Sequence, residues 1–239
     1  MLNTVTISGA DDGVDPEALF RLYEEFPFVE WGILFSEKRS GLPRYPSKPW
    51  INRLASYSPP MRLSAHLCGD LARRAILGDF EVKEPENWRR VQLNGVSIPE
   101  NGSERVKFTS MTRRWMHRHI EWIFQCRDYG QLIEFDGFAK NLLYGSKLFD
   151  PSAGRGVETR AWPQYPPDNT GYAGGIKPST VVGVIREIEE IQRSKPQDYW
   201  IDMESGVRDA SNVFDLYLVR QVLEAAKPFV DPRRLRPVP

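Results

Sequence analysis

Eight short apolar segments, separated by polar stretches and helical patterns, constrain the fold of this chain most strongly. Parallel strands have this character when helices cover one face and a core covers the other. Eight strands alternating with helices close a barrel. The predicted strands are residues 4–8, 29–35, 62–68, 90–94, 131–135, 147–150, 170–173 and 199–203. The sequence therefore predicts an α/β fold, a (β/α)8 TIM barrel of residues 1–230, with a mobile tail of residues 231–239.

Helices are predicted from hydrophobic periodicity and from their start signals. Residues 178–191 open with Pro178, which suits a first helical position, and residues 213–226 carry apolar side chains at helical spacing. Further helices are predicted at residues 16–25, 71–77 and 112–126. His117 and His119 would lie on different faces of the last of these, so we expect surface or packing roles and no shared metal.

Three long polar segments interrupt this alternation, at residues 37–58, 95–110 and 151–169. Loops of this length inside a compact domain are usually functional or disordered. They follow the second, fourth and sixth predicted strands. We therefore expect them to cap the carboxyl ends of the strands, where barrel enzymes carry their active sites.

Charge and cysteine content exclude several classes of function. Lys+Arg and Asp+Glu both number 32, which gives no reason to expect a nucleic-acid or membrane surface. Cys68 and Cys126 show neither disulfide nor metal-ligand spacing. No signal-like N-terminus or bilayer-length apolar run is apparent. We expect a cytoplasmic protein with a small-molecule ligand and no metal or cofactor, and its oligomeric state stays open.

Two glycine-containing strand ends predict a phosphate site. Gly174 and Gly175 end the seventh predicted strand, and Ser205 and Gly206 follow the eighth. Backbone N–H groups at such positions approach a ligand without obstruction by side chains. Barrels often bind phosphate after strands seven and eight. A small phosphorylated ligand is therefore expected.

Five ordered motifs resemble those of the phosphoribosylanthranilate isomerases. They are VTISG at 5–9, VQLNG at 91–95, FD at 149–150 with GRG at 154–156, AGGIKP at 173–178 and IDMESGV at 201–207. The resemblance implies a TIM barrel that performs an Amadori rearrangement in tryptophan biosynthesis, a reaction that turns an aldose into a ketose. It also implies that Asp150 is the general acid, and that the general base is a cysteine at the end of the first strand.

Ser8 occupies the position of that cysteine. A serine hydroxyl is a weak base unless a neighbouring group activates it, and positioned proton transfer commonly contributes ~10²–10⁴-fold. We therefore expect the family reaction to be slow unless another group acts. Cys68 and His66 fall on one face of the third predicted strand, with Asp70 just beyond. Asp11 and Asp12, after the first strand, are further candidates.

Five more residues are candidates for ligand binding. Arg44 is the nearest match to the arginine that the resemblance implies after the second strand, and its guanidinium suits a phosphate or carboxylate. Arg155 lies between two glycines, and Asn94 ends the fourth strand. Asp202 corresponds to a family acid near the substrate. Glu204 stands where the family often has a small polar residue, and would repel a phosphate if it pointed inward.

Three functions stay open on these residues. The leading one is an isomerase that acts through Asp150 with a base still to be identified. The second is a barrel that binds a phosphorylated ligand but has lost isomerisation. The third is a lyase or hydrolase that uses His66, Cys68 and Asp70.

Overall fold

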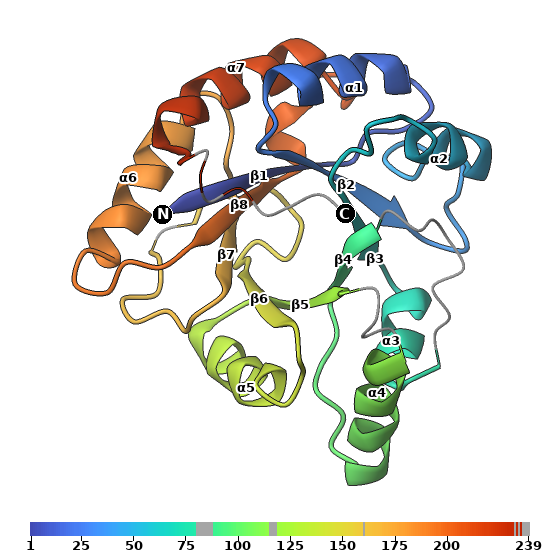
Figure 1. The fold of residues 1–239 in the computed structure, drawn as a ribbon, viewed down its shortest axis with the longest axis vertical. Coiled ribbons are helices and arrows are strands. Elements are labelled where there is room, and N and C mark those ends of the chain that lie inside the picture. Colours follow the sequence, from blue (N-terminus) through green and yellow to red (C-terminus); the bar gives the residue numbers. More distant parts are fainter. Residues whose placement is uncertain (80–87, 115–118, 160, 232, 234, 236–239) are drawn as a thin grey trace.

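The chain folds into a closed barrel of eight parallel strands. The computed structural model describes residues 1–79, 88–114, 119–159, 161–231, 233 and 235. The strands pair in chain order and β8 pairs with β1 (Figure 1). They are β1 (Leu2–Ser8), β2 (Val29–Phe35), β3 (Leu63–Leu67), β4 (Trp88–Leu93), β5 (Glu121–Cys126), β6 (Gly145–Phe149), β7 (Thr170–Ala173) and β8 (Tyr199–Met203). The predicted (β/α)8 barrel is confirmed.

Helices surround the barrel in the order expected for this fold (Figure 1). They are α1 (Pro16–Glu25), α2 (Lys48–Ala55), α3 (Asp70–Ile76), α4 (Gly102–Arg114), α5 (Tyr129–Ala139), α6 (Val181–Ile191) and α7 (Leu216–Ala226), with short 3₁₀ helices η2 (Ser205–Val207) and η3 (Lys227–Phe229). The long polar segments follow β2, β4 and β6, as predicted. The first two contain α2 and the start of α4, whereas the third contains no helix in its described residues, 151–159 and 161–169.

The helix predicted at residues 112–126 and the strand predicted at residues 131–135 are wrong. β5 occupies Glu121–Cys126, and α5 covers the residues assigned to a strand. Trp122, Ile123 and Phe124 form a continuous buried run, and periodicity alone cannot distinguish such a strand from a buried helix. The Asp128 carboxylate marks the start of α5 by accepting from the Gln131 N–H at 2.9 Å.

The other helix predictions differ from the structure by three residues at most. The largest differences are at α6, which begins at Val181 and not at Pro178, and at α7, which begins at Leu216 and not at Val213. His119 is exposed and contacts the Tyr144 hydroxyl at 2.8 Å, as a surface role requires. His117 lies outside the described residues, as do residues 232, 234 and 236–239 of the predicted tail.

A buried ion pair occupies the middle of the barrel. Nη1 of Arg90 donates to Oε1 of Glu30 at 2.7 Å, and its guanidinium carbon lies 4.1 Å from the Trp200 ring centroid. Gly171 makes room for that ring, since a Cβ there would lie 2.1 Å from Cε2 of Trp200. Burial alone would lower the pKa of Arg90, but Glu30 and Glu121 raise it above its ordinary value. This charged layer stands where bulky branched residues usually fill a barrel.

Replacing Glu30 by glutamine should lower the free energy of unfolding by about 3 kcal/mol, because Arg90 stays charged and buried with one carboxylate fewer. Urea unfolding followed by circular dichroism measures the change. The control is Glu17→Gln, which breaks the exposed pair with Arg21 (3.2 Å) and should cost less than about 1 kcal/mol. Equal, small losses in both variants would contradict a stabilising role for the buried pair.

Candidate functional site

Polar side chains from six parts of the barrel converge at the carboxyl ends of the strands. They come from β1, β3, β4, β5 and β8 and from the residue that follows β6. They line one small cavity and are Ser8, His66, Gln92, Gln125, Asp150 and Asp202. Active sites of barrel enzymes lie at this end. The structure therefore brings Ser8, His66, Asp150 and Asp202 together at the end of the barrel where a site was predicted.

Ser8 contacts both Asp202 and His66. Its hydroxyl donates to Oδ1 of Asp202 at 2.9 Å and lies 3.4 Å from Nδ1 of His66. Gly32, which pairs with Ser8 in the sheet, leaves room for this approach. A Cβ at Gly32 would lie 2.2 Å from the Ser8 hydroxyl and 2.7 Å from Cε1 of His66. The serine at the end of β1 is therefore placed to hold a carboxyl group.

Asp202 titrates close to neutral pH. Its pKa is raised to about 7, first by burial and then by the charges of Asp150, Glu204 and Glu30, against the lowering effect of the Ser8 hydrogen bond. The pKa of His66 is instead lowered to about 3, by burial and by the Arg90 charge. At neutral pH the imidazole is therefore uncharged, while Asp202 exchanges between its acid and its carboxylate.

Asp150 has a different environment, in which four hydrogen bonds are donated to its carboxylate. The donors are Nε2 of Gln125 (2.7 Å), the N–H (3.1 Å) and hydroxyl (2.6 Å) of Ser152, and the N–H of Gly154 (2.8 Å). Gln125 is oriented in turn by the Gly95 N–H, which donates to its Oε1 at 3.1 Å. These donors therefore fix the orientation of the Asp150 carboxyl group in the cavity.

The predicted His66, Cys68 and Asp70 set is not assembled. The His66 ring faces Ser8 and Gln92, and Asp70 lies at the surface beside Arg73 and Lys38. The Cys68 thiol contacts Nδ2 of Asn94 at 3.5 Å, and burial raises the pKa of this thiol above its ordinary value. Asn94 also accepts from Nε2 of Gln92 at 3.0 Å. These contacts favour a neutral thiol over the thiolate that the third function would need.

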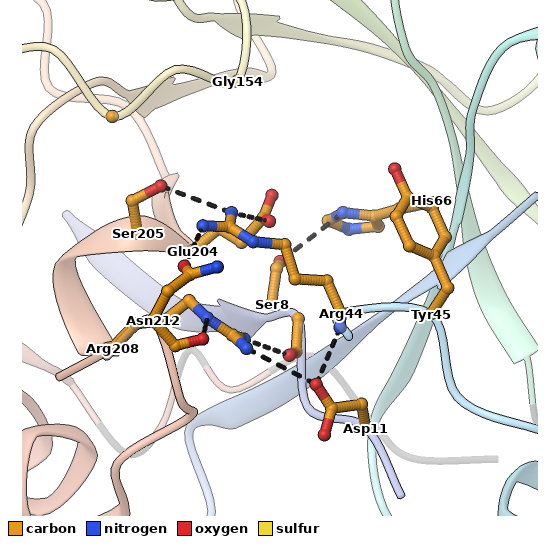
Figure 2. A network of polar contacts seen from close by, with 12 residues as sticks. Ser8, Asp11, Arg44, Tyr45, His66, Gly154, Glu204, Ser205, Arg208 and Asn212 are labelled. Carbon is orange, nitrogen blue, oxygen red and sulfur yellow. Dashed lines mark hydrogen bonds and ion pairs between the residues drawn. The ribbon is translucent and has the colours of Figure 1, made fainter. Parts of the chain in front are cut away.

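Arg44 reaches across the mouth of the barrel to the segment after β8, as Figure 2 shows. Its guanidinium pairs with Glu204, donates to Oδ1 of Asn212 at 2.5 Å and lies 3.4 Å from the Ser205 hydroxyl. Its backbone N–H donates to Asp11 at 2.7 Å, and its φ of 75° is unusual for a residue with a side chain. The contacts on both sides therefore hold Arg44 in place.

The negative charge of Glu204 is consequently balanced by its ion pair with Arg44. The expected repulsion of an anionic ligand is thus countered within the site. Arg208 supports the same region, because it donates to the Gly9 carbonyl oxygen at 2.7 Å and lies 3.4 Å from Asp11. Asp11 therefore joins the loops after β1, β2 and β8, while Asp12 accepts from the Ser47 N–H at 2.7 Å.

We call the predicted phosphate site, formed by Gly174, Gly175, Ser205 and Gly206, the cradle. The segment Val157, Glu158 and Thr159, which we call the strap, covers the cradle at Gly174 and Gly175. The Thr159 hydroxyl donates to the Ala173 carbonyl oxygen at 3.3 Å. A Cβ on Gly174 would lie 2.3 Å from that hydroxyl, and one on Gly175 would lie 2.3 Å from Cα of Glu158. The space that a side chain would need at these two glycines is therefore filled by the Thr159 hydroxyl and the Glu158 backbone.

The cavity that remains has a volume of about 60 Å³. Small-molecule pockets usually hold about 300–1,000 Å³. Gly174, Gly175, Ser205 and Gly206 all line it, whereas Arg155 is exposed and bonds the Ser152 carbonyl oxygen at 2.9 Å. A sugar phosphate is therefore larger than the cavity as it stands.

Four site residues were not predicted from the sequence: Gln92, Gln125, Arg208 and Asn212. Gln92 lies inside a predicted apolar strand, where the available signal was the alternation that directs it into the barrel. Gln125 lies inside residues 112–126, which were predicted as a helix. Arg208 and Asn212 act through loop contacts that no local pattern indicates.

Comparison with solved structures supports the fold. The phosphoribosyl anthranilate isomerase of Thermus thermophilus superimposes with a TM-score of 0.60 at 16% identity, over 95% of this chain and 99% of that one. The phospho-2-dehydro-3-deoxyheptonate aldolase of Thermotoga maritima gives 0.52 at 10% identity, over 98% and 71%. These likenesses establish the barrel fold. No family model and no curated protein sequence matches the chain. Within the described residues, no helix has the length and apolar character to cross a bilayer.

Replacing Asp202 by asparagine should stabilise the protein at pH 8 by roughly 4 kcal/mol, the free energy that separates a pKa of about 7 from the ordinary 3.8. The folded state binds the Asp202 proton more tightly than the unfolded state does. Its stabilising effect is complete below pH 3.8 and is lost as the pH rises through 7. Urea unfolding of both proteins should thus converge near pH 4. A difference independent of pH would contradict the raised pKa.

Proposed function

We propose that this barrel is an intramolecular isomerase, which converts the aldose form of a small phosphorylated sugar to its ketose. Two carboxyl groups transfer protons to and from the sugar. The contrast between Asp150 and Asp202 carries the proposal. Both are buried and line one cavity, yet the Asp150 carboxyl group accepts four hydrogen bonds, while burial raises the pKa of Asp202 to about 7. Pairs with such different environments supply the acid and the base of many enzymes.

The two carboxyl groups take complementary roles in this proposal. Asp202 gives its proton to the ring oxygen of the sugar and opens the ring. Asp150 removes the proton from C2′, the step that leads to the ketose. One proton leaves the protein and one returns to it, and the pair resets by exchange with water. This assignment reverses the role of Asp150 that the family resemblance implies, because Asp202, with a pKa of about 7, is the carboxyl group that can hold a proton to donate near neutral pH.

Ser8 positions the acid in this scheme and is not itself the base. Its hydroxyl donates to Asp202 at 2.9 Å, a contact that needs no thiolate. The loss of the family's cysteine is therefore compatible with proton transfer. Phosphoribosylanthranilate is the first substrate to test, because the motifs resemble that isomerase family and the solved isomerase shares the fold.

Asp150→Asn and Asp202→Asn should each lower kcat/KM by ~10²–10⁴-fold, because each removes one positioned proton transfer. The measurement is turnover of phosphoribosylanthranilate, together with exchange of the C2 proton of ribose 5-phosphate into D₂O by NMR. Asp70→Asn and Cys68→Ser are controls that should keep wild-type rates. Loss of activity in Cys68→Ser, with Asp150→Asn intact, would favour the lyase or hydrolase. No turnover and no exchange by the wild-type protein would reject the isomerase.

Ser8→Ala should move the pH–rate profile to higher pH. The Ser8 hydrogen bond lowers the pKa of Asp202, so its loss raises that pKa, and the acid stays protonated to a higher pH. Steady-state rates between pH 5 and 9 would reveal the shift. Loss of activity at every pH with no shift would identify Ser8 as a direct participant in proton transfer.

A barrel that binds a phosphorylated ligand without isomerising it is the second candidate. Ser8 at the position of the family's catalytic cysteine and the long loops favour it. Ligand at about 100 times its dissociation constant adds ~2.7 kcal/mol of stability, or roughly 5–10 °C in melting temperature for a domain of this size. A thermal shift with ribose 5-phosphate, without C2 exchange, would support this candidate over the isomerase.

A further inference from the structure

The strap places an anionic side chain beside the predicted phosphate site. Oε1 of Glu158 lies 2.8 Å from Nζ of Lys177, two residues beyond Gly175. The Glu158 backbone lies directly over the glycine, because a Cβ on Gly175 would be 2.6 Å from the Glu158 nitrogen. The Glu158 carboxylate therefore pairs with the cation that could bind a phosphate. The Glu158 backbone covers the glycine that could contact that phosphate.

We propose that Glu158 occupies the place of the ligand's anionic group when the protein is closed. Lys177 then determines specificity by releasing the Glu158 carboxylate and pairing with a phosphate of the ligand. This inference rests on the proposed phosphate site but not on the isomerase chemistry. In the closed state Lys177 pairs with the strap. In the open state the strap leaves Gly174 and Gly175, and Lys177 faces the phosphate.

The energies of these contacts permit such an exchange. Lys177 and Glu158 are 44% and 63% exposed, and ion pairs this accessible contribute only about 0–1 kcal/mol. A phosphate dianion carries more charge than one carboxylate, and a hydrogen bond to a charged group contributes about 1.5–3 kcal/mol. The Thr159 contact with Ala173, at 3.3 Å, is a neutral bond of ordinary strength. Nothing in the strap is therefore held too strongly for a phosphorylated ligand to displace.

The loop that carries the strap also reaches the second half of the cradle. A Cβ on Gly156 would lie 2.7 Å from Cβ of Ser205. Gly154 and Gly156 line the cavity of about 60 Å³, so displacement of this loop would enlarge the cavity beside Ser205.

Phosphate binding by the full-length protein tests the exchange independently of turnover. Calorimetric titration with inorganic phosphate and with ribose 5-phosphate should give dissociation constants about 2–5-fold lower in Glu158→Gln, because the competing charge is gone. Lys177→Met should raise them by roughly tenfold or more. Ribose alone should show no such dependence. The matched control is Asp168→Asn, which breaks the exposed Lys195 pair (2.9 Å) made by the same loop away from the cradle.

Hydrogen exchange measured by mass spectrometry supplies the structural readout. With ribose 5-phosphate bound, residues 157–159 should lose protection while residues 174–177 gain it. Unchanged affinity in both Glu158→Gln and Lys177→Met, or no phosphate binding by any variant, would overturn the inference. If the protein isomerises its substrate while both variants keep the wild-type affinity for phosphate, the inference fails and the proposed function stands. If phosphate replaces Glu158 as predicted but the C2 proton of the sugar does not exchange with D₂O, the proposed function is rejected and the inference stands.

Discussion

The buried pair of Arg90 and Glu30 places two charges in the barrel interior, next to the candidate site. Arg90 is fixed by Glu30 at 2.7 Å and by the Trp200 ring, for which Gly171 makes room. Burial is the main cause of the lowered pKa of His66 and of the raised pKa of Asp202. The Arg90 charge adds to the first shift and the Glu30 charge adds to the second. Charges in the barrel interior act strongly because little water screens them.

The candidate site combines this interior with a strongly restrained mouth. Arg44 joins the loop after β2 to the segment after β8, and in doing so neutralises Glu204. The strap closes the opposite side over Gly174 and Gly175. Both closures are made by loops, whereas Ser8 and Asp202 end strands. Rigid strands thus position the proton-transfer groups, and loops control what reaches them.

The strand ends were predictable because a barrel turns chain order into spatial order. Asp150, Asp202 and the glycines each end a strand, so their meeting at one mouth follows from the fold. β5 was missed because Trp122, Ile123 and Phe124 give no periodicity that separates strand from helix. The contacts of Arg208, Asn212 and Glu158 depend on loop conformations, which no local pattern specifies. The raised pKa of Asp202 depends first on burial and then on the charges of Asp150, Glu204 and Glu30, and a sequence does not show the burial.

The central claim is that Asp202 is a carboxyl group that titrates near neutral pH. NMR titration of protein labelled with ¹³C at the aspartate carboxyl carbons observes it directly, with Asp202→Asn assigning the resonance. The account predicts a midpoint at a pH of about 7 for Asp202. A midpoint near 4, the ordinary range for an aspartate, would contradict it.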